Sequence, residues 1–340
     1  MSKSLFICPW CTLGGVERSL LNRALALREA GNDQQFFVRF LHDGPALDRF
    51  QSAIDALSLS GLMKLHQGEG EDFDRYVIVD CPDGLTIIPP HADVYVECHT
   101  TYPDSKQYLR DLPSSIRAVL SPSDQFSGEI RPLVPSRTPV RTLWNYVPEV
   151  KRATLPKLNS EPSFTFFHYG RMDFWKNDAE VVATFAEVAR NEPRAKFILC
   201  GDNLGEDRYF RYLSDAGLIG RCRLMPSISF EDVDTFLRQM VEARAIFISS
   251  SRGESFGLAA AEAMSHGIPV LLSDIRGHRA LVRSQEAFLY PLYDTSSAAE
   301  KLLLLSRNWA DVSRTARDMI EDYADVHMIN RAWKSAMDLS

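Results

Sequence analysis

The sequence of 340 residues has few cysteines, no excess of basic charge and no long hydrophobic run. No apolar stretch reaches membrane-spanning length, and the apolar run in the N-terminal MSKSLFICPW is too short for a signal peptide. The formal net charge of −7 argues against a general nucleic-acid binder, because such proteins are usually basic. We therefore expect a cytoplasmic protein with no nucleic-acid partner, and a peripheral contact with the inner face of a membrane stays open.

The six cysteines are spread along the chain, unlike the dense disulfide framework of a small secreted domain. Cys8 and Cys11 form a C-x-x-C pattern, which can be a redox pair or half of a zinc site. No second C-x-x-C completes a zinc site, and both thiols close a short apolar segment, where cysteine behaves as a small hydrophobe. The hydrophobic interpretation is favoured, with a redox role as the alternative.

Strand and helix patterns alternate along the chain, which predicts α/β domains with parallel sheets covered on both faces. The length favours two hydrophobic cores, and the proline-containing stretch at 148–162 has the composition of a linker. We predict two Rossmann-like, doubly wound domains at 1–150 and 151–320 that face each other across a cleft. The helical pattern at 321–340 is expected to pack back toward the N-terminal domain.

The segment 249–274, SSSRGESFGLAAAEAMSHGIPVLLSD, keeps two carboxylates, Glu254 and Glu262, in an apolar context. It predicts a buried strand, a turn and a helix, and the amides at a helix N-terminus attract phosphate. Glu262, about one turn into the helix, could accept hydrogen bonds from ribose hydroxyls. The alternative is a capped helix with Glu254 exposed and Glu262 in a salt bridge, and this segment alone leaves the two interpretations open.

The segment 168–177, HYGRMDFWKN, follows the first predicted strand of the second domain and carries two cations. Arg171 offers a planar fork to phosphate, and Lys176 offers a point charge. Together they could clamp a diphosphate at the strand end. The alternative is a solvated basic loop.

These segments, G-R-x-x-x-x-K and E-S-F-G-L-x-x-x-E-A-M-x-x-G-x-P-V, resemble the donor-binding domain of family-4 glycosyltransferases of the GT-B fold. In the first domain, Gly14-Gly15-Val16-Glu17 is similar to the family's G-G-x-E, and VYVECH resembles the strand that leads to its active-site histidine, here His99. WNYVPEV resembles the P-N-G-V element, but Trp144 and Tyr146 replace its proline and glycine.

The resemblance implies a retaining transfer from a nucleoside-diphosphate sugar to a glycan, lipid-linked or small-molecule acceptor, without metal or other cofactor. It implies that Arg171 and Lys176 hold the diphosphate, that Glu262 binds the ribose and that Glu254 meets hydroxyls of the sugar. It implies catalytic roles for His99, Arg171, Lys176 and Glu254, and donor binding by Gly14, Gly15, Arg171, Lys176, Glu254, Ser255, Phe256, Gly257, Leu258 and Glu262. The alternatives are a nucleotide-sugar epimerase of the same fold and a non-catalytic nucleotide-sugar-binding protein.

Other polar residues have simpler explanations. Asp232 and Asp234 form a D-x-D, which binds metal in a different glycosyltransferase fold, but acids near a helix start are better explained by the helix dipole. His168 and His266 are expected to be structural. Four arginines could meet an anionic acceptor, although a solvated face is favoured because acids are interleaved among them: Arg117, Arg131, Arg137 and Arg141.

Overall fold

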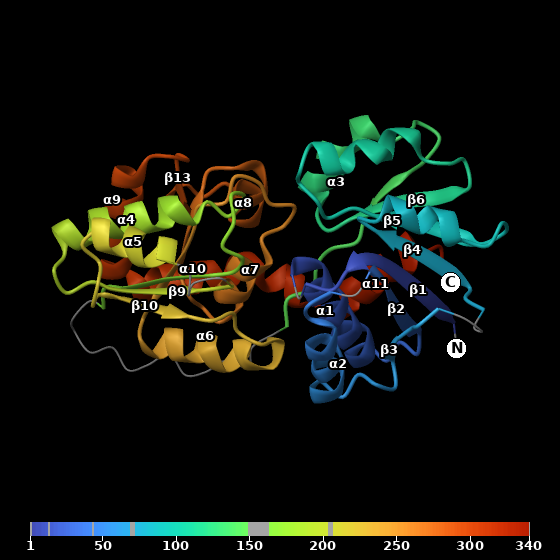
Figure 1. Ribbon diagram of the computed structural model, residues 1–340, viewed down its shortest axis with the longest axis horizontal. Coiled ribbons are helices and arrows are strands. Elements are labelled where there is room, and N and C mark those ends of the chain that lie inside the picture. The colour runs from blue at the N-terminus through green and yellow to red at the C-terminus, as the bar shows by residue number, and fades with distance from the viewer. Residues whose placement is uncertain are drawn as a thin grey trace. The chain divides into compact units, whose positions relative to one another are not determined.

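The computed structural model describes residues 2–12, 14–42, 44–68, 72–148, 163–202 and 207–339. The chain divides into two units, which are described one at a time: unit 1 is Met1–Pro148 with Tyr323–Ser340, and unit 2 is Glu149–Asp322 (Figure 1). The predicted linker lies almost entirely outside the described residues, and the cleft stays a prediction. None of the described helices is long and apolar enough to cross a membrane.

Unit 1 is built on a parallel sheet, as its β-branched and aromatic runs predict. Within the described residues the sheet has seven strands in the order β3-β2-β1-β4-β5-β6-β7. Its central strands are buried, since helices cover both faces of such a sheet. The strands are β1 (Lys3–Trp10), β2 (Gln35–His42), β3 (Met63–Leu65), β4 (Arg75–Val79), β5 (Asp93–Glu97), β6 (Ile116–Ser121) and β7 (Val140–Thr142).

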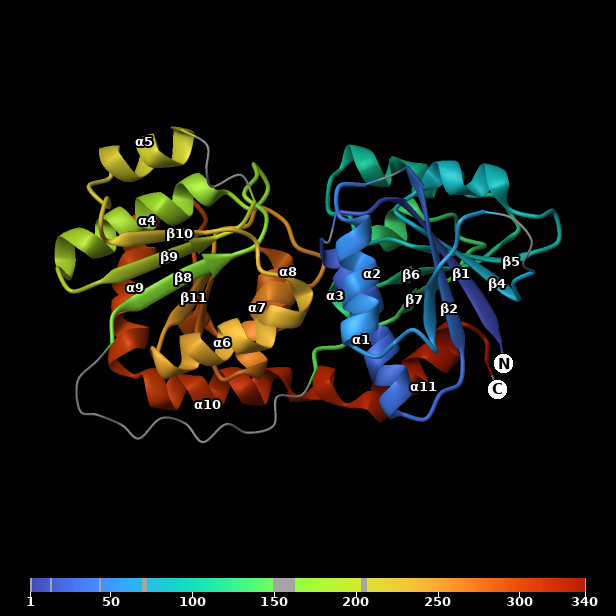
Figure 2. The same ribbon diagram turned by 60° about the horizontal axis from the view of Figure 1, so that its bottom comes forward.

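The C-terminal helix α11 (Val326–Ala336) belongs to unit 1 and lies beside α1 (Gly15–Glu29) (Figure 2). Trp333 of α11 is fully buried and contacts the rings of Phe6 and Phe36. These contacts make α11 part of the unit 1 core. Truncating a tryptophan in such a core typically costs about 3–5 kcal/mol of folding stability. The remaining helical segments of unit 1 are α2 (Leu47–Ala56), α3 (Asp124–Ile130), η1 (Pro82–Ile87), η2 (Asp104–Asp111) and η3 (Arg131–Leu133).

Unit 2 repeats this architecture with the strand order β10-β9-β8-β11-β12-β13, again parallel throughout the described residues. Helices α4 and α5 lie on one side of the sheet and α6 on the other (Figure 1). The strands are β8 (Thr165–Tyr169), β9 (Lys196–Cys200), β10 (Cys222–Met225), β11 (Ile246–Ser249), β12 (Val270–Ser273) and β13 (Leu289–Tyr290). The helices are α4 (Asp178–Asn191), α5 (Asp207–Asp215), α6 (Val233–Glu242), α7 (Leu258–Ser265), α8 (Arg276–Leu281), α9 (Thr295–Arg307) and α10 (Trp309–Ile320), with η4 (Phe230–Asp232), η5 (Glu286–Phe288) and η6 (Glu321–Ala324).

The strand order reverses once in each sheet, between β1 and β4 in unit 1 and between β8 and β11 in unit 2. Ligands of open α/β sheets bind at such a point, outside the carboxyl ends of the strands, because the loops on either side diverge there. The loops after β8 and β11 are the two segments that carry the sequence motifs of unit 2. The topology therefore brings 170–177 and 250–257 to one place.

Candidate active site

The loop that follows β8 is organised by Asp173, which the sequence analysis did not single out. Its Oδ1 accepts the backbone N–H groups of Trp175 and Lys176, each at 2.9 Å. Its Oδ2 lies 3.5 Å from Nη2 of Arg171, a side chain that is half exposed. Asn177 then adopts a left-handed backbone (φ 54°) and begins α4. This turn places both predicted cations at the carboxyl edge of the sheet.

Lys176, in the loop after β8, pairs with Glu254, in the loop after β11. Its Nζ lies 2.5 Å from Glu254 Oε1, which also accepts the Ser251 hydroxyl at 2.8 Å. The side chains are only 23 % and 14 % exposed, so the alternative of an exposed Glu254 is wrong. Burial alone would raise the pKa of Glu254, but the charge of Lys176 brings that pKa below its ordinary value. Glu254 is therefore ionised at neutral pH.

The N-terminus of α7 lies directly after this pair. Gly257 has a left-handed backbone (φ 92°), which favours glycine, and as the N-cap residue it offers no side chain to cap the helix. Phe256 is buried at 4 % exposure, so a ligand would meet its backbone rather than its ring. The turn also depends on Gly277, because a Cβ there would lie 2.2 Å from the Glu254 carbonyl oxygen. A helix N-terminus of this kind carries partial positive charge that favours an anion.

His278 is a site residue that the sequence analysis missed. Its Nδ1 lies 2.9 Å from the Ser273 carbonyl oxygen, so Nδ1 carries the proton and donates. Burial lowers the pKa of His278, which favours the neutral ring. A Cβ on Gly257 would lie 4.0 Å from His278 Nε2, which places this ring nitrogen beside the start of α7. Its place shortly after β12 is a weak sequence signal, because histidines there are commonly structural.

Glu262 lies on α7, as predicted, and its side chain is buried at 4 % exposure. The Tyr169 hydroxyl, at the end of β8, lies 2.7 Å from Glu262 Oε2 and 3.0 Å from the Ala259 carbonyl oxygen. A buried carboxylate needs such partners. Tyr169 therefore joins the strand end to α7, a contact between residues 93 positions apart.

Asp232 and Asp234 both contact protein groups. Asp232 accepts the Ser229 hydroxyl at 2.6 Å, and Asp234 pairs with Arg238 at 2.8 Å at the start of α6. Asp234 also lies 3.0 Å from His266 Nε2, while His266 Nδ1 lies 2.8 Å from the Glu262 carbonyl oxygen. His266 is therefore structural, as predicted, and it fixes α7 to α6.

His168 is buried on β8, and its Nδ1 lies 2.9 Å from the Ile248 carbonyl oxygen. The ring stacks on Phe247. Burial lowers the pKa of His168, so the ring is neutral. These contacts fit the structural role that we predicted.

In unit 1 the loop after β1 leads into α1, which begins with Gly14 as N-cap and has no side-chain cap. Glu17 turns back on this loop, and its Oε1 accepts the Thr12 backbone N–H at 2.6 Å. Outside its own helix and chain neighbours, a Cβ on Gly15 would meet no atom of the described residues within 4 Å. Packing in the described part of the chain therefore does not require glycine at 15.

His99 follows β5 and is held at both its backbone and its ring. Its backbone N–H lies 3.1 Å from each carboxylate oxygen of Asp80, and its Nε2 lies 2.8 Å from Glu97 Oε1. Glu97 in turn accepts a two-pronged pair of hydrogen bonds from Arg23, at 3.0 and 2.6 Å. The sequence analysis missed Asp80, Glu97 and Arg23, because nothing in their local spacing links them to His99.

The four arginines weighed as an anionic acceptor surface all make contacts within unit 1. Arg117 pairs with Asp93 at 2.7 Å, and Arg131 donates to the Thr138 carbonyl at 2.7 Å. The other two also donate to backbone carbonyls, Arg137 to Leu112 at 2.7 Å and Arg141 to Ala336 at 2.9 Å.

Cys8 and Cys11 are buried free thiols, and burial raises the pKa of Cys8, which disfavours a reactive thiolate.

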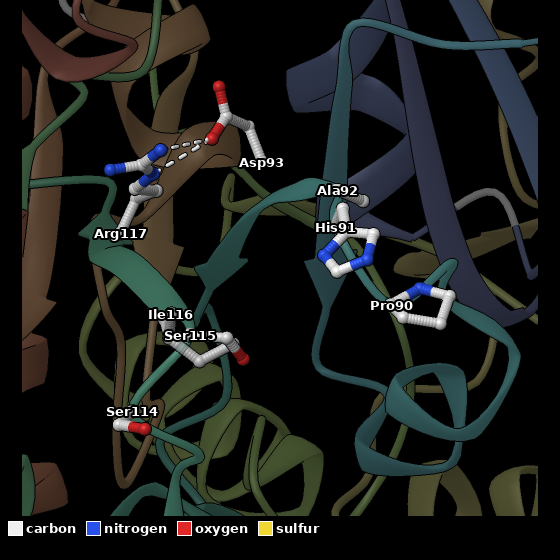
Figure 3. Close-up of a pocket in the computed structure, with 8 residues that line it drawn as sticks. All are labelled: Pro90, His91, Ala92, Asp93, Ser114, Ser115, Ile116 and Arg117. Atoms are coloured by element: carbon white, nitrogen blue, oxygen red, sulfur yellow. Dashed lines mark hydrogen bonds and ion pairs between the residues drawn. The ribbon is translucent and has the colours of Figure 1, made fainter.

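An open pocket of about 420 Å³ lies at the amino ends of β5 and β6, lined by 90–93 and 114–117 (Figure 3). The Asp93–Arg117 ion pair forms part of its wall. This edge of the sheet is opposite the one that carries His99. The pocket is therefore separate from the predicted site residues of unit 1.

Fold and site together define a class of protein. Two doubly wound parallel sheets form the GT-B fold, and the second sheet carries a cation–carboxylate pair and a helix N-terminus where its strand order reverses. The particular family follows from the sequence of unit 2. The chain belongs to the family "Glycosyl transferases group 1", whose model matches residues 151–325.

Two curated relatives and one solved structure show the extent of the similarity. The chain is 29 % identical over 177 residues to the GDP-mannose:cellobiosyl-diphosphopolyprenol alpha-mannosyltransferase of Xanthomonas oryzae, covering 50 % of this chain and 46 % of the relative. It is 30 % identical over 145 residues to the UDP-Gal:alpha-D-GlcNAc-diphosphoundecaprenol alpha-1,3-galactosyltransferase of Escherichia coli, covering 42 % and 36 %. The chain thus spans less than half the length of these relatives. A TarM variant from S. aureus, solved with UDP among its ligands, superposes with a TM-score of 0.78 at 14 % identity, covering 99 % and 100 % of the two chains.

Proposed function

We propose that the protein is a glycosyltransferase that moves a sugar from a nucleoside-diphosphate sugar to a hydroxyl group of a saccharide acceptor. The observation that carries the proposal is the Lys176–Glu254 pair beside the N-terminus of α7 at the switch point of unit 2. A cation and helix amides suit the diphosphate, and an ionised carboxylate suits the hydroxyls of a sugar. One place thus offers partners for both parts of the donor.

In this proposal Arg171 and Lys176 act most strongly as the bond to the sugar breaks. Negative charge then grows on the departing diphosphate, and preorganised cations stabilise it more than they stabilise the bound donor. Glu262 is proposed to bind the ribose from its position on α7, with Tyr169 holding its carboxylate in place. Gly15 is proposed to bring its backbone N–H to the diphosphate, which the absence of a side chain at this position would permit.

The proposed acceptor class comes from the relatives. Both curated relatives are named for α-glycosyl transfer to a sugar linked through diphosphate to a polyprenol. A lipid-diphosphate-linked saccharide is therefore the first acceptor to test, ahead of free glycans and small molecules. An acceptor of this kind would bring the protein to a membrane surface.

We propose that the reaction retains the anomeric configuration and needs no divalent metal. Retention would follow if the acceptor attacks on the face that the diphosphate leaves, with the diphosphate taking the proton. Glu254 is paired with Lys176 and Ser251, which suits a hydroxyl-binding carboxylate better than a nucleophile. Metal independence is supported by the two cations near the proposed diphosphate site and by the protein partners of Asp232 and Asp234.

The test begins with binding and continues with product analysis. Nucleoside diphosphates and their sugars are screened by thermal shift, since a ligand bound only by the folded state raises the melting temperature. The nucleotide sugars that bind are then incubated with and without a diphosphate-linked saccharide, and products are identified by mass spectrometry. We expect donor sugar on the acceptor with the wild type and far less with Glu254→Gln. Conversion of the donor without acceptor would show an epimerase, and binding without any reaction would show a binding protein.

A further inference from the structure

A continuous buried contact chain in unit 1 runs from the C-terminal helix to His99. The guanidinium carbon of Arg23, on α1, lies 5.8 Å from the ring of Trp333, on α11. Both terminal nitrogens of Arg23 donate to Glu97, at 3.0 and 2.6 Å, and Glu97 is fully buried at the end of β5. Glu97 Oε1 lies 2.8 Å from His99 Nε2.

The charges in this chain determine where the proton of the His99 ring lies. Burial alone would raise the pKa of Glu97, but the charge of Arg23 holds that pKa well below its ordinary value. An ionised carboxylate can only accept hydrogen bonds, so His99 Nε2 must be the donor. In the neutral ring the lone pair then lies on Nδ1.

The other ring nitrogen remains available to a ligand. His99 Nδ1 has no hydrogen-bond partner within the described part of the chain, and the side chain is 9 % exposed. Asp80 holds the backbone N–H of His99 and Glu97 holds its ring, so the ring cannot rotate away without breaking the contact with Glu97. His99 is thus a preorganised acceptor at the ligand-binding edge of unit 1.

We infer that Glu97 and Arg23 are positioning residues that hold His99 with its proton on Nε2, so that Nδ1 accepts a hydrogen bond from a substrate hydroxyl group. The hydroxyl belongs to a sugar, and this part of the inference rests on the proposed function. Trp333 packs its ring against the guanidinium of Arg23, so the C-terminal helix helps to position the site.

The competing explanation is an ion pair that serves folding alone. Buried ion pairs are weak evidence for stability, because well-packed apolar residues often serve as well. Such a pair would still set the tautomer of His99, but disturbing it would leave kcat unchanged. The kcat of Glu97→Gln, compared at unchanged nucleotide affinity, therefore separates the two explanations.

The first experiment measures that tautomer in the full-length wild type. Histidine ring nitrogens are labelled with ¹⁵N, and the His99 signals are assigned by their loss in His99→Gln. Long-range ¹H–¹⁵N spectra then show which nitrogen carries the proton at a pH where the ring is neutral. We expect the proton on Nε2, and a proton on Nδ1 would overturn the inference. This measurement needs no donor, so it holds even if the proposed reaction is not found.

The second experiment uses Glu97→Gln with Glu129→Gln as the matched control. Glu129 pairs with Lys106 at 2.6 Å in the same unit and does not contact His99. We expect Glu97→Gln to give a mixture of tautomers and to lower kcat on the order of 10²-fold, the typical cost of misplacing a group by about 1 Å. Affinity for the free nucleoside diphosphate should stay within twofold in both variants.

Equal tautomers and equal kcat in Glu97→Gln and Glu129→Gln would refute the role of Glu97. If Glu97→Gln does not fold, Arg23→Lys takes its place, since it keeps the charge but loses the two-pronged geometry. Trp333→Phe and Trp333→Leu extend the test to α11. We expect phenylalanine to preserve the tautomer and leucine to disturb it, and identical spectra for these two variants would remove Trp333 from the chain.

Discussion

Replacing Lys176 by methionine removes the partner of Glu254 but keeps most of the side-chain volume. Breaking a fully buried ion pair by removing one partner costs about 3–5 kcal/mol. Lys176 and Glu254 retain 23 % and 14 % exposure, so solvent offsets part of the loss, and we expect roughly 1–3 kcal/mol. Chemical denaturation followed by fluorescence measures this difference. Lys196→Met is the control, because Lys196 is exposed on β9 of the same unit.

The destabilisation should depend on pH in a stated direction. The pKa of Glu254 is lowered in the folded wild type, so its stabilising contribution is present above the ordinary glutamate pKa of about 4.3. This contribution is lost as the pH falls through the lowered folded pKa. Without Lys176, burial should raise the pKa of Glu254. Protonation at acidic pH then removes the free-energy cost of burying a carboxylate without its partner. The stability difference between Lys176→Met and wild type should therefore shrink from neutral pH to below about pH 4.

A double-mutant cycle isolates the pair. Lys176→Met/Glu254→Gln should be more stable than the sum of the single effects predicts, because neither charge is left without its partner. In transfer assays Lys176→Met should lower kcat on the order of 10²–10³-fold, with a smaller effect on donor affinity. The reasoning fails if Lys176→Met and Lys196→Met have the same stability at neutral pH and the same kcat.

Four further predictions concern the donor and the reaction. Glu262→Ala should weaken nucleoside-diphosphate binding by roughly 1.5–3 kcal/mol in calorimetry, and unchanged affinity would exclude the ribose role. Gly15→Ala should fold normally but bind donor weakly. Gly277→Ala should lose stability, because its Cβ would lie 2.2 Å from the Glu254 carbonyl oxygen. Equal stabilities of the two variants would contradict both assignments. Transfer activity should persist in the presence of a chelator. A loss of activity that magnesium or manganese restores would indicate that Asp232 and Asp234 bind a metal ion. Proton NMR of fresh product should show the anomeric configuration of the donor, and an inverted linkage would overturn the same-face mechanism.

The sequence alone was sufficient where the chemistry lies within one short segment. The buried strand β11, the left-handed Gly257 and the helix α7 are contiguous, so their order predicts a helix N-terminus at a strand end. The helix α4 also lies within one contiguous segment, DAEVVATFAEVARN, whose apolar residues recur at helical spacing. The short strands β3, β7, β10 and β13 escaped prediction, because segments of two to four residues carry almost no periodicity.

The contacts that hold the site residues were decided by the tertiary structure. Lys176 and Glu254 are 78 positions apart, and they pair because β8 and β11 are neighbours at the point where the strand order reverses. The sequence analysis predicted that Lys176 binds phosphate and kept an exposed Glu254 as an alternative. It did not predict their pairing, because no local pattern shows such a pair. His278 was missed for the same reason.

The support of His99 shows this limit most clearly. The family resemblance points to His99 through the segment that precedes it, but it points to none of the residues that support it. Arg23 lies 74 positions before its partner Glu97, and Trp333 comes from the last helix of the chain. Parallel strands require long crossovers, so residues at the ends of different strands are distant in sequence even when they meet at one sheet edge. Local propensity determines which strands and helices form. The order of the strands, which depends on how the whole core packs, determines which side chains meet at their ends.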